Sequence, residues 1–232
     1  MTGRPLNPEE RAAAHRILLI LSALFIASLV TCNLIFRKFF TWEFGGMTFE
    51  QSVGLLPYPL TFLVTDLISE LFGRRKANQV VVAGLVASVF VLGMVLLAQV
   101  APAAVWSPVS DDQFTQAFGQ TTLAVGASMA AYLLAQFVDV RIFHFWKALT
   151  SGRMLWLRNN LSTIPSQFLD TFTVLFLLCS VGEIEWAMFG ALLVNGFVFK
   201  LLVALADTPL VYLGAWWVRR RFGLAFGEEL NL

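Results

Sequence analysis

Charged residues are scarce in this chain. Only 13% of its 232 residues are Asp, Glu, Lys or Arg, about half the share of an ordinary soluble domain. The net charge is +1 and no basic stripe runs along the sequence, so nucleic acid is not an expected partner. Cysteine is rare as well. The two that occur, Cys32 and Cys179, favour buried free thiols over a disulfide. Their spacing offers no metal site, and no cofactor is expected.

Apolar residues dominate instead: 58% of the chain is hydrophobic, with 22 Phe and 7 Trp. A helix needs about 20 apolar residues to cross the hydrocarbon core of a bilayer. Six segments qualify, at about 17–36, 51–71, 78–100, 120–143, 161–181 and 187–216. The sequence therefore predicts an all-α polytopic membrane protein with six transmembrane helices, embedded in a lipid bilayer. The first segment lacks a signal-peptide cleavage pattern and is expected to remain as a membrane anchor.

The positions of the basic residues predict the topology. Both termini are predicted to be cytoplasmic, because cytoplasmic connections carry an excess of Lys and Arg. The predicted domains are a cytoplasmic tail at 1–16, a six-helix transport domain at 17–218, and a basic then acidic cytoplasmic tail at 219–232. The outer connections at 37–50, with a turn at Gly45–Gly46, and at 101–119 hold few basic residues. Thirteen of the 16 basic residues fall on the cytoplasmic side: Arg4, Arg11, Arg16, Arg74, Arg75, Lys76, Arg141, Lys147, Arg153, Arg158, Arg219, Arg220 and Arg221.

A four-residue pattern occurs twice in the fourth and fifth spans, as Gln136-Phe-Val-Asp139 and Gln167-Phe-Leu-Asp170. In each copy an amide and a carboxylate share one helix face. A hairpin centred near Arg153 would bring Gln136 level with Asp170 and Asp139 level with Gln167. Such a site suits a planar heterocycle that has N–H donors beside a carbonyl. Two alternatives stay open: the four groups satisfy only one another, or the pattern recurs by chance.

Five further polar residues lie within the predicted spans and are candidates for the same site: Asn33, Asp66, Glu70, Asn195 and Lys200. Polar groups are costly in lipid, so each needs a partner or a function. Asn33 could bond a neighbouring helix. Glu70 could pair with basic residues at the cytoplasmic end. Lys200 needs a carboxylate, and the second, fourth or fifth span is expected to supply it.

Two longer stretches carry a family resemblance. Residues 59–73 (PLTFLVTDLISELFG) and 155–163 (LWLRNNLST), the latter leading into Gln167 and Asp170, resemble the queuosine precursor transporter family. The resemblance maps a TDxxxE pattern onto Thr65, Asp66 and Glu70, and its QxxD patterns onto the two pairs above. The connection at 101–119 has no counterpart. The resemblance implies a fold related to the substrate-binding subunits of energy-coupling-factor transporters.

The same resemblance implies a substrate class. It predicts import of 7-deazaguanines (7-cyano-7-deazaguanine, 7-aminomethyl-7-deazaguanine or queuine) across a bacterial inner membrane. A guanine-like edge offers N1–H and a 2-amino group to a carboxylate, and O6 to a Gln amide or to Lys200. Phe137 and Phe168 are turned off the Gln and Asp face, so packing is favoured over stacking on a base.

Two rival functions and one further partner stay open. The chain could be a substrate-binding subunit that docks on an ATP-driven module through Ala23 and Ala27. It could also be an intramembrane aspartyl hydrolase using Asp139 and Asp170. Neither aspartate follows a Gly-x-Gly pattern, so an enzyme is not expected. A second copy of the chain is a possible partner, as a homodimer.

Overall fold

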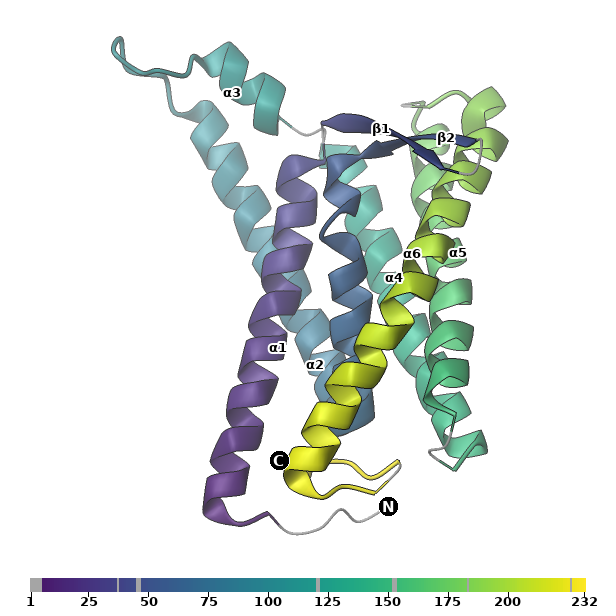
Figure 1. Cartoon of the computed structure of the whole chain (residues 1–232). Helices are drawn as coiled ribbons and strands as arrows, with labels where there is room; N and C mark the ends of the chain where they lie inside the picture. The colour runs from purple at the N-terminus through teal and green to yellow at the C-terminus, as the bar shows by residue number, and fades with distance from the viewer. Residues whose placement is uncertain are drawn as a thin grey trace.

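Long helices make up most of the chain in the computed structural model (Figure 1). It describes residues 6–232 except 37, 45–46, 120–121, 152–153, 183 and 226. The predictions for Arg4, Arg37, the Gly45–Gly46 turn and the hairpin centre at Arg153 fall outside the described residues. The first helix, α1 (Pro8–Ile35), begins nine residues before the predicted span. A capping box explains this early start: the Asn7 side chain accepts from Glu10 N at 2.8 Å, and Asn7 N donates to Glu10 at 3.0 Å.

The helix α2 (Tyr58–Val100) carries one label but consists of two helical segments that run in opposite directions (Figure 1). They correspond to the predicted second and third spans. The break is at Gly73, whose backbone has φ 79° and ψ 170°, a region that essentially only glycine adopts. Two residues from the end of the chain cover the break. Leu230 N donates to Leu71 O at 2.7 Å, and a Cβ on Gly73 would lie 2.3 Å from Glu229 Oε2.

Three more long helices complete the bundle: α4 (Thr122–Leu149), α5 (Leu155–Ser180) and α6 (Trp186–Phe222). Among the described residues, four stretches are long and apolar enough to cross a membrane: Pro8–Ile35, Val53–Val100, Leu155–Ser180 and Trp186–Phe222. Their outer faces carry exposed apolar side chains such as Val86 and Phe90, which are 62% and 66% exposed. The chain is a multi-pass helical membrane protein.

The connections at 37–50 and 101–119 contain regular structure, and two short strands are added to the predicted helical bundle. Strands β1 (Phe39–Phe44) and β2 (Met47–Ser52) pair antiparallel, with Phe39 opposite Ser52. Aromatic and polar residues alternate along β1, a pattern typical of a strand. The short 3-10 helix η1 (Val53–Leu55) follows, so α2 starts at Tyr58 instead of 51. The second connection contains α3 (Asp111–Phe118), which a capping box of Ser110 and Gln113 starts.

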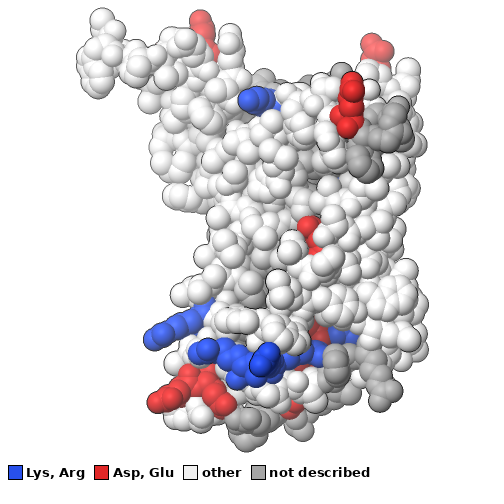
Figure 2. All heavy atoms as spheres, in the orientation of Figure 1, with Lys and Arg blue, Asp and Glu red and all other residues white. Residues whose placement is uncertain are grey.

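Basic side chains gather at one end of the molecule. Figure 2 shows most visible Lys and Arg near the end where Figure 1 places both termini. We call this the basic end, and the opposite end, covered by β1 and β2, the hairpin end. The charge distribution agrees with the bias in the sequence on which the predicted topology rests.

Candidate functional site

A cavity of about 240 Å³ lies between α1, α2, α4, α5 and α6, next to η1 at the hairpin end. Apolar residues such as Leu29, Leu85 and Val174 form much of its wall. Its polar lining residues are Asn33, Ser52, Tyr58, Ser88, Ser128, Tyr132, Asp170 and Lys200. A cavity of about 150 Å³ already holds benzene, so this one has room for a larger, bicyclic ring. An apolar chamber with a few polar groups is typical of a small-molecule site.

Asp170 and Lys200 form an ion pair on the wall of this cavity. Lys200 Nζ lies 2.6 Å from Asp170 Oδ2, and the two side chains are 10% and 7% exposed. The Tyr58 hydroxyl donates to the same Oδ2 at 2.6 Å, and Lys200 Nζ lies 4.7 Å from the centre of the Tyr58 ring. The prediction that Lys200 pairs with a carboxylate of another span is confirmed, and the partner comes from the fifth.

Gln167 lies one turn before Asp170 and lines a second, smaller pocket. This pocket of about 20 Å³ also borders Asp66, Asp207 and Thr163. It shares Tyr58 and Lys200 with the large cavity, so the two spaces adjoin. Gln167 Oε1 is buried and has no donor among the described residues.

The other predicted pair, Gln136 and Asp139, is fully buried between α4 and α5. Ser166 Oγ donates to Asp139 Oδ1 at 2.9 Å, so the register of the two helices differs by one residue from the predicted pairing with Gln167. Neither residue is among those that line the two pockets. The structure thus brings Asp170 and Gln167 to the pockets and places Asp139 behind them. Gln136 has no partner among the described residues for either amide atom.

Asp66 faces this second pair from α2. The carboxyl groups of Asp66 and Asp139 lie near enough to interact electrostatically. Thr163 Oγ1 donates to Asp66 Oδ2 at 3.4 Å. Both carboxyl groups are buried, with Asp66 1% and Asp139 0% exposed.

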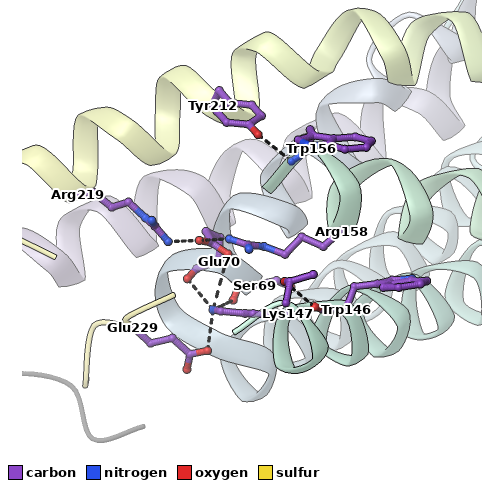
Figure 3. A network of polar contacts seen from close by, with 10 residues as sticks. Ser69, Glu70, Trp146, Lys147, Trp156, Arg158, Tyr212, Arg219 and Glu229 are labelled. Atoms are coloured by element: carbon purple, nitrogen blue, oxygen red, sulfur yellow. Dashed lines mark hydrogen bonds and ion pairs between the residues drawn. The ribbon is translucent and has the colours of Figure 1, made fainter. Parts of the chain in front are cut away.

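Glu70 lies in a different environment, at the basic end (Figure 3). Its Oε1 accepts from Arg158 and from Arg219, and its Oε2 lies 3.8 Å from Lys147 Nζ. Lys147 also binds Glu229 at 2.8 Å and the Glu70 carbonyl at 2.9 Å. We call Glu70, Lys147, Arg158, Arg219 and Glu229 the Glu70 cluster. Glu70 therefore has the basic partners considered as its alternative role, and it does not line either pocket.

Of the remaining predicted residues, some line a pocket and others do not. Asn33 lines the large cavity, whereas Asn195 is half-buried on α6 and lines neither pocket. Phe168 packs on Phe172 and Phe197, as the packing interpretation expected. Cys32 and Cys179 are free thiols.

Sequence reasoning missed several residues of the site. Tyr58 was visible as the aromatic residue between Pro57 and Pro59 at the start of a span. Ser166 and Thr163 are small hydroxyl residues beside the second Gln-Asp pattern, and Tyr132 lies one turn before the first. Their type gave little signal, because Ser and Thr in membrane helices commonly bond their own backbone. Ser166 does so too, with Ser162 O at 2.9 Å.

Known proteins are similar to this chain over most of its length. A family model described as "Putative vitamin uptake transporter" matches residues 52–214. A relative from Bacillus subtilis (strain 168), described as "Probable queuosine precursor transporter", is 29% identical over 176 residues, which cover 74% of each chain. No solved structure matches. The family match covers more than half of the chain and includes Asp66, Asp139, Asp170 and Lys200. The chain belongs to the vitamin uptake transporter family and is a membrane transporter.

Proposed function

We propose that this transporter imports 7-deazaguanine precursors of queuosine across the bacterial inner membrane. The candidates are 7-cyano-7-deazaguanine, 7-aminomethyl-7-deazaguanine and queuine. The printed description of the Bacillus subtilis relative supports this substrate class. The large cavity supports it independently, since it combines room for a bicyclic ring with a small number of polar groups.

The observation that carries the proposal is the carboxylate of Asp170 beside the ammonium of Lys200 on the cavity wall. Tyr58 and Lys200 both donate to Oδ2, so Oδ1 has no donor among the described residues. A guanine-like edge presents two adjacent donors, N1–H and the 2-amino group, next to the acceptor O6. Asp170 can accept the two donors while Lys200 donates to O6. Tyr58 and Tyr132 also line the cavity and are candidates to stack on the base.

The proposed topology has six spans with both termini in the cytoplasm. In this orientation the hairpin end, and with it the cavity, faces the outside. The Glu70 cluster closes the cytoplasmic side. Import then requires the basic end to open after the base has bound, as in an alternating-access cycle.

A binding assay on the purified protein tests the proposal. A ligand that binds only the folded state raises stability by about 2.7 kcal/mol at a concentration one hundred times its Kd. We expect 7-cyano-7-deazaguanine to raise the Tm of the wild type, and adenine, which lacks both donors, to leave it unchanged. Asp170→Asn should lose the shift and the uptake of radiolabelled 7-cyano-7-deazaguanine.

The control for Asp170→Asn is Asp112→Asn, the same exchange on the exposed helix α3. It should keep both the Tm shift and the uptake. A wild type that shows no shift with any deazaguanine would overturn the substrate class. An Asp170→Asn variant that binds and transports normally would overturn the site.

A second candidate function is a substrate-binding subunit of an ATP-driven importer of the energy-coupling-factor type. Ala23 and Ala27 favour it, because both lie exposed on the outer face of α1, where a partner helix could approach closely. Transport by the purified chain alone in liposomes would exclude an obligate partner. Uptake only in the presence of ATP and further subunits would support one.

A further inference from the structure

The Asp66 and Asp139 pair lies outside the cavity and is not needed to hold the base. The two carboxyl groups come from α2 and α4, and each accepts from a hydroxyl group of α5. Asp66 Oδ1 and Asp139 Oδ2 are buried and receive no hydrogen bond from any other described residue. Two carboxyl groups that face each other in a dry interior cannot both be ionised at little cost, unless a cation or a proton lies between them.

The basic residues nearby make their ion pairs elsewhere. Lys200 pairs with Asp170, while Arg158, Arg219 and Lys147 pair with Glu70 and Glu229. The other groups around the two aspartates are neutral or acidic: Glu70 one turn along α2, Ser162, Thr163 and Ser166 on α5, and Asp207 on α6. A proton is therefore the simplest positive charge to balance the pair.

The small pocket joins this pair to the cavity. It is lined by Asp66 on one side and by Tyr58 and Lys200 on the other, and its volume of about 20 Å³ accommodates roughly one water molecule. Gln167, 4% exposed, also lines it, and its Oε1 has no donor among the described residues. An acceptor without a donor, facing a space for one water, suits a proton path between the aspartates and Lys200.

We propose that Asp66 and Asp139 form a proton-binding site that couples transport to a proton gradient. In each cycle the pair takes up one proton from the outside and releases it to the cytoplasm, and no covalent bond of the substrate changes. The proton and the base bind from the same side, and with the pair protonated the occupied protein holds no uncompensated buried carboxylate when its helices rearrange. The substrate and the proton then move in the same direction. This inference rests on the proposed import of deazaguanines.

The test uses the purified full-length protein in liposomes, with radiolabelled 7-cyano-7-deazaguanine and with potassium and valinomycin to hold the membrane potential at zero. One proton per substrate predicts about tenfold accumulation for each unit of inside-alkaline pH gradient. A protonophore should abolish this accumulation. Asp139→Asn should accumulate nothing above equilibrium, yet it should still exchange labelled for unlabelled substrate at equal pH. Asp112→Asn, on the exposed helix α3, should behave like the wild type.

The outcomes separate the inference from the function on which it rests. If the wild type neither takes up nor exchanges the substrate, the proposed function is wrong. If the wild type exchanges the substrate but its accumulation ignores the pH gradient, or follows a sodium gradient instead, the proton site is wrong and the function stands. Accumulation by Asp139→Asn equal to that of the wild type also overturns the site.

A milder variant covers the case in which Asp139→Asn does not insert. Ser166→Ala removes the donor to Asp139 and keeps both carboxyl groups. Loss of a hydrogen bond to the charged form should move the pH of half-maximal uptake upward by about one unit. Ser180→Ala is the control, since Ser180 Oγ donates to Phe176 O of its own helix, at the exposed end of α5. An unchanged pH profile in Ser166→Ala contradicts the proposal.

Discussion

The Asp170–Lys200 pair and the Glu70 cluster are two buried ionic groups with different surroundings. Asp170 has one cation and one hydroxyl group as partners, and it borders a cavity of about 240 Å³. Glu70 has three basic partners and lines neither of the two pockets. A charge beside a cavity can exchange a protein partner for a ligand at little cost, because the ligand supplies the lost bonds. A carboxylate held by three basic side chains has no such replacement, and therefore stabilises one arrangement of helices.

Among the variants that test this difference, Glu70→Gln is expected to have the largest effect. The exchange keeps the shape of the side chain but leaves Arg158, which is fully buried, without its carboxylate. Breaking a buried ion pair by removing one partner costs about 3–5 kcal/mol. Thermal unfolding in detergent should show a large fall in Tm. Glu185→Gln, at an exposed position before α6, should change stability by less than about 0.5 kcal/mol. Equal Tm values for the two variants would contradict a structural role for the Glu70 cluster.

An intermediate effect is expected for Gly73→Ala, at the break of α2 beside the Glu70 cluster. The new Cβ would occupy a backbone region that costs of order 1–3 kcal/mol for other residues. It would also lie 2.3 Å from Glu229 Oε2 and displace the partner of Lys147. We expect a lower Tm with unchanged substrate affinity in the folded fraction.

The control for Gly73→Ala is Gly93→Ala, in the second segment of α2. A Cβ at Gly93 meets no atom within 4 Å, so this variant should be neutral or slightly more stable. If both glycine variants behave alike, the conformation at the break does not matter for stability.

The smallest effect is expected on the cavity side, for Tyr58→Phe. This exchange keeps the ring beside Lys200 and removes one hydrogen bond to Asp170, which is worth about 1 kcal/mol. Affinity for 7-cyano-7-deazaguanine, measured by titration, should fall about fivefold with little change in Tm. Tyr212→Phe is the matched control, because its hydroxyl group accepts from Trp156 N, remote from the cavity. If Tyr58→Phe loses stability but not affinity, the Asp170–Lys200 pair has a structural role like that of the Glu70 cluster.

The sequence predicted the helices well, because apolar runs of spanning length leave few alternatives in a membrane. Lys200 shows how far such reasoning extends to the site. A lone cation inside a span must have a carboxylate, so the existence of the pair was predictable, whereas the choice of Asp170 was not. That choice depends on how α5 and α6 are rotated about their axes, which local spacing does not determine. The predicted level of Asp139 relative to α5 was correct to within one residue, because a pair of neighbouring antiparallel helices constrains which residues lie at the same level.

The Glu70 cluster and the hairpin show what sequence reasoning did not determine, for two different reasons. Basic partners for Glu70 were expected as an alternative, but the count of charges places Arg158 and Lys147 only near the fourth connection, and their burial depends on partners distant in the chain. The strands β1 and β2 were hidden by their aromatic residues, which are equally common at membrane interfaces and in strands.

The hydrogen bond from Leu230 N to Leu71 O has a consequence for biosynthesis. The turn at Gly73 leaves the ribosome more than 150 residues before Glu229 and Leu230 that cover it. At about 5–20 residues per second, this interval lasts roughly 10–30 s. Until then Lys147 lacks its ion pair with Glu229, and the Leu71 carbonyl group lacks its hydrogen-bond donor. The turn at Gly73 is therefore incompletely stabilised in the nascent chain. A nascent chain stalled before Glu229 should therefore be more open to quality-control proteases at Gly73 than the finished protein.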